Sequence, residues 1–337
     1  MGKPKVLYAP VPSHTRRVFR PGTYSRMLRL FDVTVNESDE NFTPGEIAGK
    51  IKGFDALVTG WGTPPLGEDF FENADRLRII AHSAGSIKHM LSRDVVDRYI
   101  LPRGITVFSA NGEIAYNVAE ATIGYLIMAA RRFYDHITSV RTKGLWRDPE
   151  IPVYLQTLNG STVGVVSASK VGREVIRLLH AFDLKVILYD PYLSDWEAGR
   201  LNAEKVSLDE LFERSDFITV HAPLIPETIG MIGRGQLKLM KDGAILVNTS
   251  RGKVIDHDAL LEELRSGRII AVLDVTDPEP LPPEHPLWDL PNVILTSHYS
   301  GGVHDYHRQT QRVFLDNLRR FLAGEPLEGV VNKTLGY

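Results

Sequence analysis

Short apolar runs rich in β-branched residues alternate with helical stretches along almost the whole chain. Such runs, bounded by Gly, Asn or Ser, are typical of buried strands. Strands that alternate with helices predict an α/β fold with a doubly wound parallel sheet. A second series begins near Ser161. The strand-like runs are residues 5–11, 31–36, 54–60, 77–84 and 105–110, then 162–167, 185–190, 217–222, 244–249, 270–275 and 293–297.

The segment between the two series predicts one long buried helix. Residues 117–132 are apolar almost all round, which favours a helix covered on every side. Asn117 followed by Glu120 has the spacing of a capping box and predicts the helix start. The strand-poor stretch that follows contains Trp146 and several prolines, and we interpret it as a linker or an arm.

Two later helices also have clear signals. Asp256 predicts the start of a helix over 256–269, and Gly267 predicts its end. The last helix, about 305–323, shows one apolar stripe. The stripe consists of Val313, Phe314, Leu318, Phe321 and Leu322.

Composition excludes several kinds of function. The 337 residues suffice for about two domains, and 43% apolar residues allow a sizeable core. The net charge of −3 argues against a nucleic-acid partner. The absence of cysteine excludes disulfides, thiolate zinc sites and a cysteine nucleophile.

The N-terminus shows no targeting signal. "MGKPKVLYAP" enters a strand-like run without the apolar segment of a signal peptide. Val6 stands where a myristoylation pattern needs Ser or Thr. No stretch approaches the roughly 20 apolar residues of a membrane span. We therefore expect a cytoplasmic protein with no membrane partner.

Residues 163–175, "VGVVSASKVGREV", stand where a dinucleotide-binding turn would join a strand to a helix. Ser167 and Ser169 replace the first two glycines of the usual fingerprint, and Gly172 keeps the third. If both serines take negative φ, the backbone N–H groups can still face a phosphate at the helix N-terminus. The alternative is a strand-to-helix connection that binds nothing.

Asp190 supports the nucleotide interpretation. It ends the next predicted strand, 18 residues after Gly172, close to the spacing of an acid that holds a ribose 2′-hydroxyl. An acid there repels a 2′-phosphate, so NAD is favoured over NADP.

Residues suited to chemistry follow three later strands. Arg251 lies in a glycine turn, Asp274 at a strand end with Glu279 in the proline-rich loop beyond it, and His298 at the end of the last strand. Ligands in open α/β sheets bind at the carboxyl ends of strands. His298 with His304 and His307 could suggest a metal site, but no suitable carboxylate spacing accompanies them, so we expect none.

The region 217–302 resembles the D-isomer-specific 2-hydroxyacid dehydrogenases, and the likeness covers nearly the whole chain. It is carried by "HAPLIPETIGMIG", "MKDGAILVNTSRGKVID" and the succession of Arg251, Glu279 and His298. The resemblance implies that these three are catalytic, and that the protein is an NAD-dependent homodimer. It implies cofactor contacts from Ser169, Lys170, Val171, Asp190, His221, Ala222, Pro223, Thr228, Thr249, Ser250, Asp274 and His298.

The chemistry fits these residue types. Reduction of a 2-keto acid needs a hydride, a proton for the alkoxide and a cation for the carboxylate. Arg251 offers a planar fork for a carboxylate or keto oxygen. His298 can deliver the proton near neutral pH, and Glu279 would fix its tautomer and favour its charged form. Glu279 argues against membership of the formate dehydrogenase branch of the family, which has Gln at this position.

Two loops are predicted to contact the substrate. The loop around Ala84, Gly85 and Ser86 resembles the family loop whose N–H groups meet the substrate carboxylate. The facing loop, residues 59–65, carries Trp61 and no Lys or Arg, so a phosphorylated substrate is not favoured.

The resemblance also implies the domain arrangement. A Rossmann-type cofactor domain, 111–302, is inserted in a flavodoxin-like substrate domain formed by 1–110 and 303–337. We expect an oxidoreductase that reduces small 2-keto acids, of the glyoxylate or hydroxypyruvate type, to D-2-hydroxy acids. The alternative is a non-catalytic NAD-sensing or interaction protein on the same scaffold, suggested by the altered turn.

Overall fold

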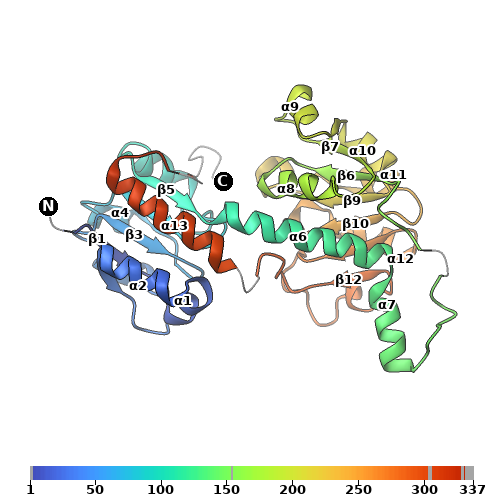
Figure 1. Ribbon diagram of the computed structural model, residues 1–337, viewed down its shortest axis with the longest axis horizontal. Helices are drawn as coiled ribbons and strands as arrows, with labels where there is room; N and C mark the ends of the chain where they lie inside the picture. The colour runs from blue at the N-terminus through green and yellow to red at the C-terminus, as the bar shows by residue number, and fades with distance from the viewer. Residues whose placement is uncertain (1–2, 153–154, 303–305, 328–329, 331–337) are drawn as a thin grey trace. The chain divides into compact units, whose positions relative to one another are not determined.

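The computed structural model describes residues 3–152, 155–302, 306–327 and 330, with the backbone alone at 111–113, 306–313 and 322. The chain divides into two compact units. Unit 1 is Met1–Ile114 with Val303–Tyr337, and unit 2 is Ala115–Gly302. Each is built around its own parallel sheet (Figure 1).

Unit 1 contains a 5-stranded sheet in the order β2-β1-β3-β4-β5, with every pair parallel. This is the flavodoxin-like order, and its direction of winding reverses between β1 and β3. The strands are β1 (Lys5–Tyr8), β2 (Asp32–Val35), β3 (Ala56–Thr59), β4 (Ile79–His82) and β5 (Thr106–Ser109).

Helices cover both faces of this sheet, because successive strand side chains point to opposite sides. Val6 and Tyr8 pack with α1, α2 and α13, whereas Leu7 packs with α3 and α4 (Figure 1). The helices are α1 (Pro12–Val18), α2 (Pro21–Leu30), α3 (Pro44–Lys50), α4 (Glu68–Asn73), α5 (Arg93–Val95), the π-helical turn η1 (Val96–Ile100) and α13 (Tyr306–Ala323).

Unit 2 contains a 7-stranded parallel sheet in the order β12-β11-β10-β9-β6-β7-β8. Read from β6, this is the Rossmann order with one strand added, and it reverses between β6 and β9. The strands are β6 (Thr162–Val166), β7 (Lys185–Tyr189), β8 (Glu204–Lys205), β9 (Phe217–Val220), β10 (Ile245–Asn248), β11 (Ile270–Leu273) and β12 (Val293–Leu295).

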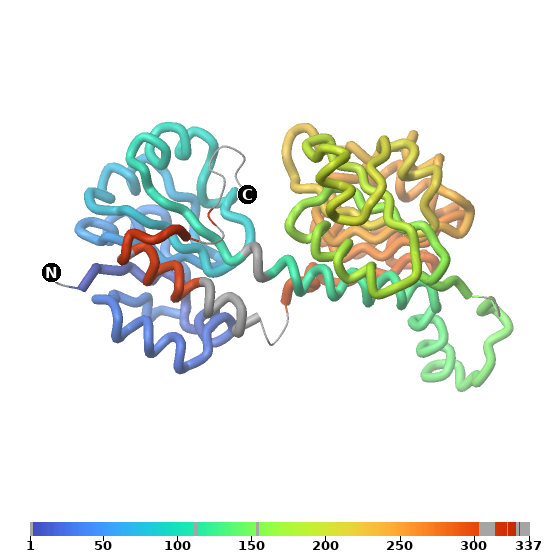
Figure 2. Tube along the Cα trace, turned by 45° about the horizontal axis from the view of Figure 1, so that its top comes forward, coloured from blue at the N-terminus to red at the C-terminus, as the bar shows by residue number. Residues whose placement is uncertain are grey.

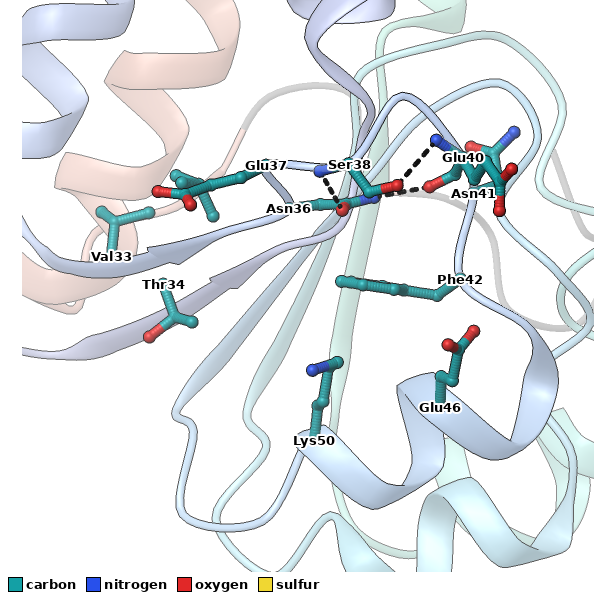
Figure 3. Close-up of a pocket in the computed structure, with 11 residues that line it drawn as sticks. Val33, Thr34, Asn36, Glu37, Ser38, Glu40, Asn41, Phe42, Glu46 and Lys50 are labelled. Carbon is teal, nitrogen blue, oxygen red and sulfur yellow. Dashed lines mark hydrogen bonds between the residues drawn. The ribbon is translucent and has the colours of Figure 1, made fainter.

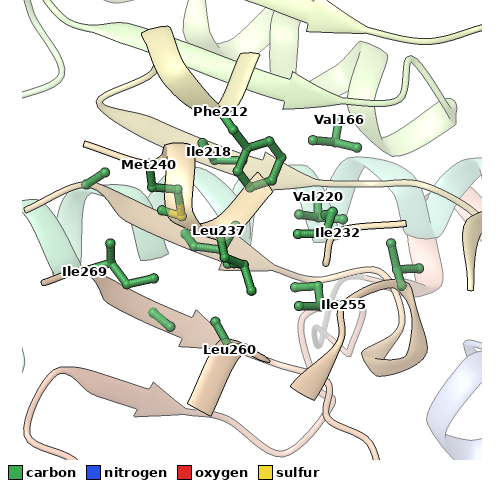
Figure 4. Packing of buried hydrophobic residues seen from close by; sticks show 14 of the residues in the cluster. Val166, Phe212, Ile218, Val220, Ile232, Leu237, Met240, Ile255, Leu260 and Ile269 are labelled. Atoms are coloured by element: carbon green, nitrogen blue, oxygen red, sulfur yellow. The ribbon is translucent and has the colours of Figure 1, made fainter. Parts of the chain in front are cut away.

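Two buried layers sandwich the second sheet. On one face Phe212, Leu237 and Leu260 pack against strand residues such as Ile218 and Val220 (Figure 4). The other face packs against α6 and α8. The helices are α6 (Asn111–Ala130), α7 (Phe133–Thr138), η2 (Ser139–Lys143), α8 (Lys170–Leu179), α9 (Asp195–Arg200), α10 (Leu208–Arg214), η3 (Pro226–Thr228), α11 (Arg234–Leu239), η4 (Gly252–Val254), α12 (His257–Arg265) and η5 (Pro286–Trp288).

The segment after α6 projects from the body of unit 2. Both views show α7, η2 and the chain that follows extending away from the sheet (Figure 1, Figure 2). This matches the arm that the sequence predicts. Within the described part of the chain, no helix has the length and apolar composition that crossing a membrane requires.

The structure confirms the fold class and every expected strand. One strand was missed, the two-residue β8. The predicted helix start at Asn117 is wrong, because α6 begins at Asn111 and Asn117 lies inside it, buried. Asp256 caps α12 as predicted, and Gly267 follows it with φ +72°. Phe314 and Leu318 are buried as expected; the side chains of Val313 and Leu322 lie outside the description.

Candidate active site

Three adjacent strands of unit 2 carry the side chains that the sequence singles out for chemistry. β10, β11 and β12 are neighbours and run parallel, so their carboxyl ends share one edge of the sheet. Arg251 follows β10, Glu279 lies in the loop after β11, and His298 follows β12. Ligands of open parallel sheets bind at this edge.

Arg251 is held in its turn by a buried asparagine. Asn248 donates from Nδ2 to the Arg251 carbonyl oxygen (3.1 Å) and accepts at Oδ1 from the Ser250 N–H (3.0 Å). The side chain is exposed overall, yet partial desolvation of the guanidinium lowers the Arg251 pKa, and the Glu279 carboxylate opposes this shift. Arginine is not deprotonated in proteins, so the group stays cationic.

Glu279 and His298 form a direct pair. His298 Nδ1 lies 2.5 Å from Glu279 Oε1, and both side chains are partly exposed. A carboxylate oxygen accepts a hydrogen bond, so Nδ1 carries the proton and donates it. The pair therefore leaves Nε2 as the ring nitrogen that can exchange a proton with a ligand. The predicted contact between these two residues is present, and Arg251 lies within electrostatic range of Glu279.

The His298 loop wraps around a buried carboxylate. Asp274 accepts from Thr296 Oγ1 (2.6 Å), Tyr299 N (3.1 Å) and Ser300 N (3.1 Å). His298 itself has φ +50°, and its N–H donates to the Asp274 carbonyl oxygen (2.9 Å). A non-glycine residue with positive φ persists only where its surroundings hold it there. Asp274 therefore holds the loop backbone that orients the His298 imidazole. The predicted contact between Asp274 and a cofactor stays a prediction.

The dinucleotide-type turn differs from the expected backbone. Ser169 has the predicted negative φ, −57°, but Ser167 has φ +78°. The condition that both serines take negative φ is therefore met by Ser169 but not by Ser167. Asp190 explains how Ser167 is held, since Asp190 Oδ2 accepts from Ser167 Oγ (3.2 Å) and from Ala168 N (2.8 Å). Gly172 is required, because a Cβ there would lie 2.0 Å from the Ser167 carbonyl oxygen.

The start of α8 fits a phosphate. Ser169 Oγ accepts from the Gly172 N–H, whereas the N–H groups of Ser169, Lys170 and Val171 have no acceptor among the described residues. Unpaired N–H groups at a helix N-terminus, with its positive dipole end, bind anions. The turn lies at the reversal of sheet order, where dinucleotides bind. The residues present therefore fit a dinucleotide.

The other predicted cofactor residues line neighbouring strand ends, mostly with their side chains engaged. His221 is fully buried; burial lowers its pKa to about 3, and Nε2 is paired with Thr219 Oγ1 (2.8 Å). The other ring nitrogen of His221, Nδ1, is buried and has no hydrogen-bond partner among the described residues. Thr228 Oγ1 donates within its own turn, to Pro223 O (2.6 Å). Also buried or nearly so are Ala222, Thr249 and Ser250.

In unit 1 the predicted carboxylate loop follows β4. The N–H groups of Ala84, Gly85 and Ser86 have no acceptor in the part of the chain that the structure describes. This is what an anion-binding loop requires. Trp61, at 40% exposure, follows β3.

Sequence reasoning missed the residues around Trp61. The His14 ring packs edge-on to Trp61, with centroids 5.0 Å apart, and the Arg17 guanidinium lies 5.0 Å from the indole centroid. Residues 59–65 themselves contain no Lys or Arg, but α1 places the Arg17 guanidinium beside Trp61. His14 Nε2 pairs with Ser83 Oγ (2.9 Å), and burial lowers the His14 pKa to about 4.

A cavity of about 660 Å³ lies elsewhere in unit 1, beside the edge strand β2 and α3 (Figure 3). Glu46 and Lys50 of α3 face it with Phe42, and Asn36 hydrogen-bonds to Ser38 and Glu40 beside it. None of the residues predicted for catalysis lines it.

Comparison with known proteins now decides the family. Residues 123–300 match the model of the D-isomer specific 2-hydroxyacid dehydrogenase, NAD binding domain. The chain belongs to this family. It is an NAD-dependent oxidoreductase acting on CH–OH donors, and nothing in the comparisons favours the non-catalytic alternative.

Individual relatives agree. The chain is 36% identical to a glyoxylate reductase of Korarchaeum cryptofilum over 85% of either chain. It is 35% identical to a D-3-phosphoglycerate dehydrogenase of Methanocaldococcus jannaschii over 90% of this chain but 56% of that protein's length. The apo structure of Rhodotorula graminis D-mandelate dehydrogenase superposes with TM-score 0.83 at 25% identity, covering 98% of both chains.

Proposed function

We propose that this dehydrogenase reduces a small 2-keto acid without a phosphate group, such as glyoxylate, with His298 as the proton donor. The observation that carries the proposal is the His298–Glu279 contact at the strand edge that also carries Arg251. Glyoxylate is the substrate named for the Korarchaeum cryptofilum relative, which this chain matches over most of both lengths.

His298 and Glu279 divide the proton chemistry between them. The protonated imidazole donates from Nε2 to the developing alkoxide oxygen and ends as the neutral ring with its proton on Nδ1. This tautomer is the one that the Glu279 contact stabilises. Glu279 therefore keeps the proton on Nδ1, so that Nε2 is the ring nitrogen that gives up its proton.

Arg251 supplies the positive charge. Its guanidinium can hold the substrate carboxylate with two parallel hydrogen bonds or polarise the keto oxygen. The desolvation that lowers its pKa also strengthens its attraction for an anion, because fewer waters compete.

The cofactor would be held at the reversal point of the second sheet. The N–H groups of Ser169, Lys170 and Val171 suit the pyrophosphate, and Asp190 suits a ribose hydroxyl. When bound, NADH supplies the hydride. We accordingly assign unit 2 to cofactor binding and unit 1, with Ala84, Gly85 and Trp61, to substrate binding.

We also propose a cytoplasmic homodimer. The arm after α6 exposes several large apolar side chains, and clusters of this kind mark interfaces. These are Phe133, Tyr134, Ile137, Val140, Leu145 and Trp146, each at least 41% exposed and Trp146 at 87%. A second copy of this chain is the occupant we propose, since the family resemblance implies a homodimer and the arm projects from unit 2.

A panel of keto acids tests the function. Purified protein is mixed with NADH or NADPH and with glyoxylate, hydroxypyruvate, pyruvate or a phosphorylated 2-keto acid, and loss of the reduced cofactor is followed by absorbance. We expect turnover with NADH and glyoxylate, and much less with NADPH. Tight NADH binding without turnover on any acid would contradict the proposal and favour a sensor.

A further inference from the structure

We infer that His257 is a positioning residue for the loop carrying Glu279. It accepts a hydrogen bond from the Asp277 N–H of that loop, and we call this bond the latch. This inference rests on the function proposed for Glu279 and His298. His257 is half-buried and is the first residue of α12, immediately after the N-cap Asp256. It belongs to none of the groups that the sequence assigns to the reaction.

The hydrogen bonds of His257 fix its protonation. Nδ1 lies 3.2 Å from the Ile255 carbonyl oxygen, which can only accept. Nδ1 therefore carries the proton of the neutral ring, and Nε2 presents a lone pair. That lone pair accepts the N–H of Asp277, at 3.1 Å. Both ring nitrogens are satisfied in this one tautomer.

The hydrogen bond from the Asp277 N–H matters because the loop makes few other hydrogen bonds. In residues 276–281 the structure describes no other backbone N–H that donates a hydrogen bond. Pro278 and Pro280 have no N–H to donate, so the loop has few ways to be held. Thr276 Oγ1 adds an internal brace to Pro278 O (2.8 Å). Glu279 lies two residues beyond the latched amide.

The latch also ties the loop to the arginine turn. A Cβ on Gly252 would lie 2.6 Å from the Asp277 nitrogen, so the Arg251–Gly252 turn packs directly against the same peptide. The Asp277 nitrogen thus packs against Gly252, and its N–H donates to His257. Release of its amide would let Glu279 move relative to His298, and a misplacement of about 1 Å can cost about 100-fold in rate.

The latch depends on a neutral imidazole. Protonation places a hydrogen on Nε2, which then repels the Asp277 N–H. Burial lowers the His257 pKa and His285 lowers it further, while the Ile255 hydrogen bond, Asp277 and Asp256 raise it. Burial dominates, so the latch is closed near neutral pH and opens on acidification.

Three variants test this. His257→Leu removes the acceptor, His257→Gln can keep one, and Asp258→Leu is the matched control, since Asp258 is exposed and has no described contact with the loop. Hydrogen exchange of a peptide covering 276–281 reports the Asp277 amide. We expect lost protection and about a 10-fold lower kcat in the leucine variant, with unchanged NADH affinity. The glutamine variant and the control should stay within about twofold of wild type.

A second readout does not depend on turnover. The proton on His298 Nδ1, bonded to Glu279, should give a strongly downfield NMR signal that weakens in His257→Leu and persists in His257→Gln. Wild-type protein should lose Asp277 protection on acidification, and the leucine variant should show no such change. Unchanged exchange in His257→Leu would overturn the latch. Lost protection with an unchanged His298 signal would overturn the positioning role, whether or not the keto-acid assay succeeds.

Discussion

Gly252 lies so close to Thr276 that a Cβ atom added to Gly252 would be 2.0 Å from the Thr276 carbonyl oxygen. Arg251 directly precedes this glycine, and Glu279 follows Thr276 by three residues. Two segments far apart in sequence are therefore in backbone contact just beside their functional side chains. A methyl group at position 252 would force the turn that carries Arg251 away from the loop that carries Glu279.

Gly252→Ala should therefore damage the site. No real Cβ occupies such a position, so the turn or the loop must shift. We expect kcat to fall by about 100-fold, together with a lower melting temperature. Gly235→Ala is the control, because a Cβ at Gly235 meets nothing within 4 Å. An alanine variant at 252 with normal turnover would show that this contact does not set the geometry.

The effect of a substitution at Ser167 on stability should depend on how well the new residue tolerates a positive φ. With φ +78°, a β-branched residue there is strained, whereas glycine is relaxed but loses the hydroxyl contact with Asp190. We expect Ser167→Val to be about 1–2 kcal/mol less stable than Ser167→Gly, measured by urea unfolding. Equal stabilities would mean that Ser167 does not hold this conformation in solution.

Stability should fall in mild acid. Burial lowers the pKa of His14 to about 4, and those of His82 and His221 to about 3, below the ordinary value of 6.5. The unfolded chain then binds more protons, so these groups do not lower stability above about pH 6.5. They lower it increasingly as pH falls toward 4 for His14 and toward 3 for His82 and His221.

His14 alone accounts for on the order of 3 kcal/mol over this range. Urea unfolding between about pH 7 and about pH 5 measures the slope. His14→Gln should unfold more easily at neutral pH but with a shallower pH dependence than wild type. Parallel slopes for the two proteins would contradict the assignment.

The exposed apolar side chains of the arm should determine whether the protein forms a dimer. Replacing Ile137 and Trp146, at 56% and 87% exposure, with glutamate should convert a dimer to a monomer in analytical ultracentrifugation. Glutamate at Trp196, exposed to 70% on α9, is the matched control and should leave the dimer intact. A wild-type monomer at micromolar concentration would remove the proposed role of the arm.

Much of the fold was predictable because its signals are local. Every expected strand is present, since a buried parallel strand is an uninterrupted apolar run bounded by turn residues. Asp256 and Gly267 marked α12 for the same reason. The two-residue β8 left no such run, and the start of α6 was hidden because residues 111–116 continue the helix without a break.

The parts of the site that escaped prediction depend on long-range contacts. Arg17 meets Trp61, and His257 meets Asp277, only after the chain folds. The positive φ of Ser167 depends on the Asp190 carboxylate, whose effect on the turn no local pattern reveals. His304, whose metal interpretation was already disfavoured, lies outside the described residues, as does the side chain of His307.

The central claim is that the Glu279-held imidazole of His298 supplies the proton to the keto acid. The most direct test measures NADH affinity by fluorescence and glyoxylate turnover on the same His298→Ala protein. The account predicts unchanged affinity and a loss of kcat of about 10²–10⁴-fold. Turnover equal to that of wild type would contradict it.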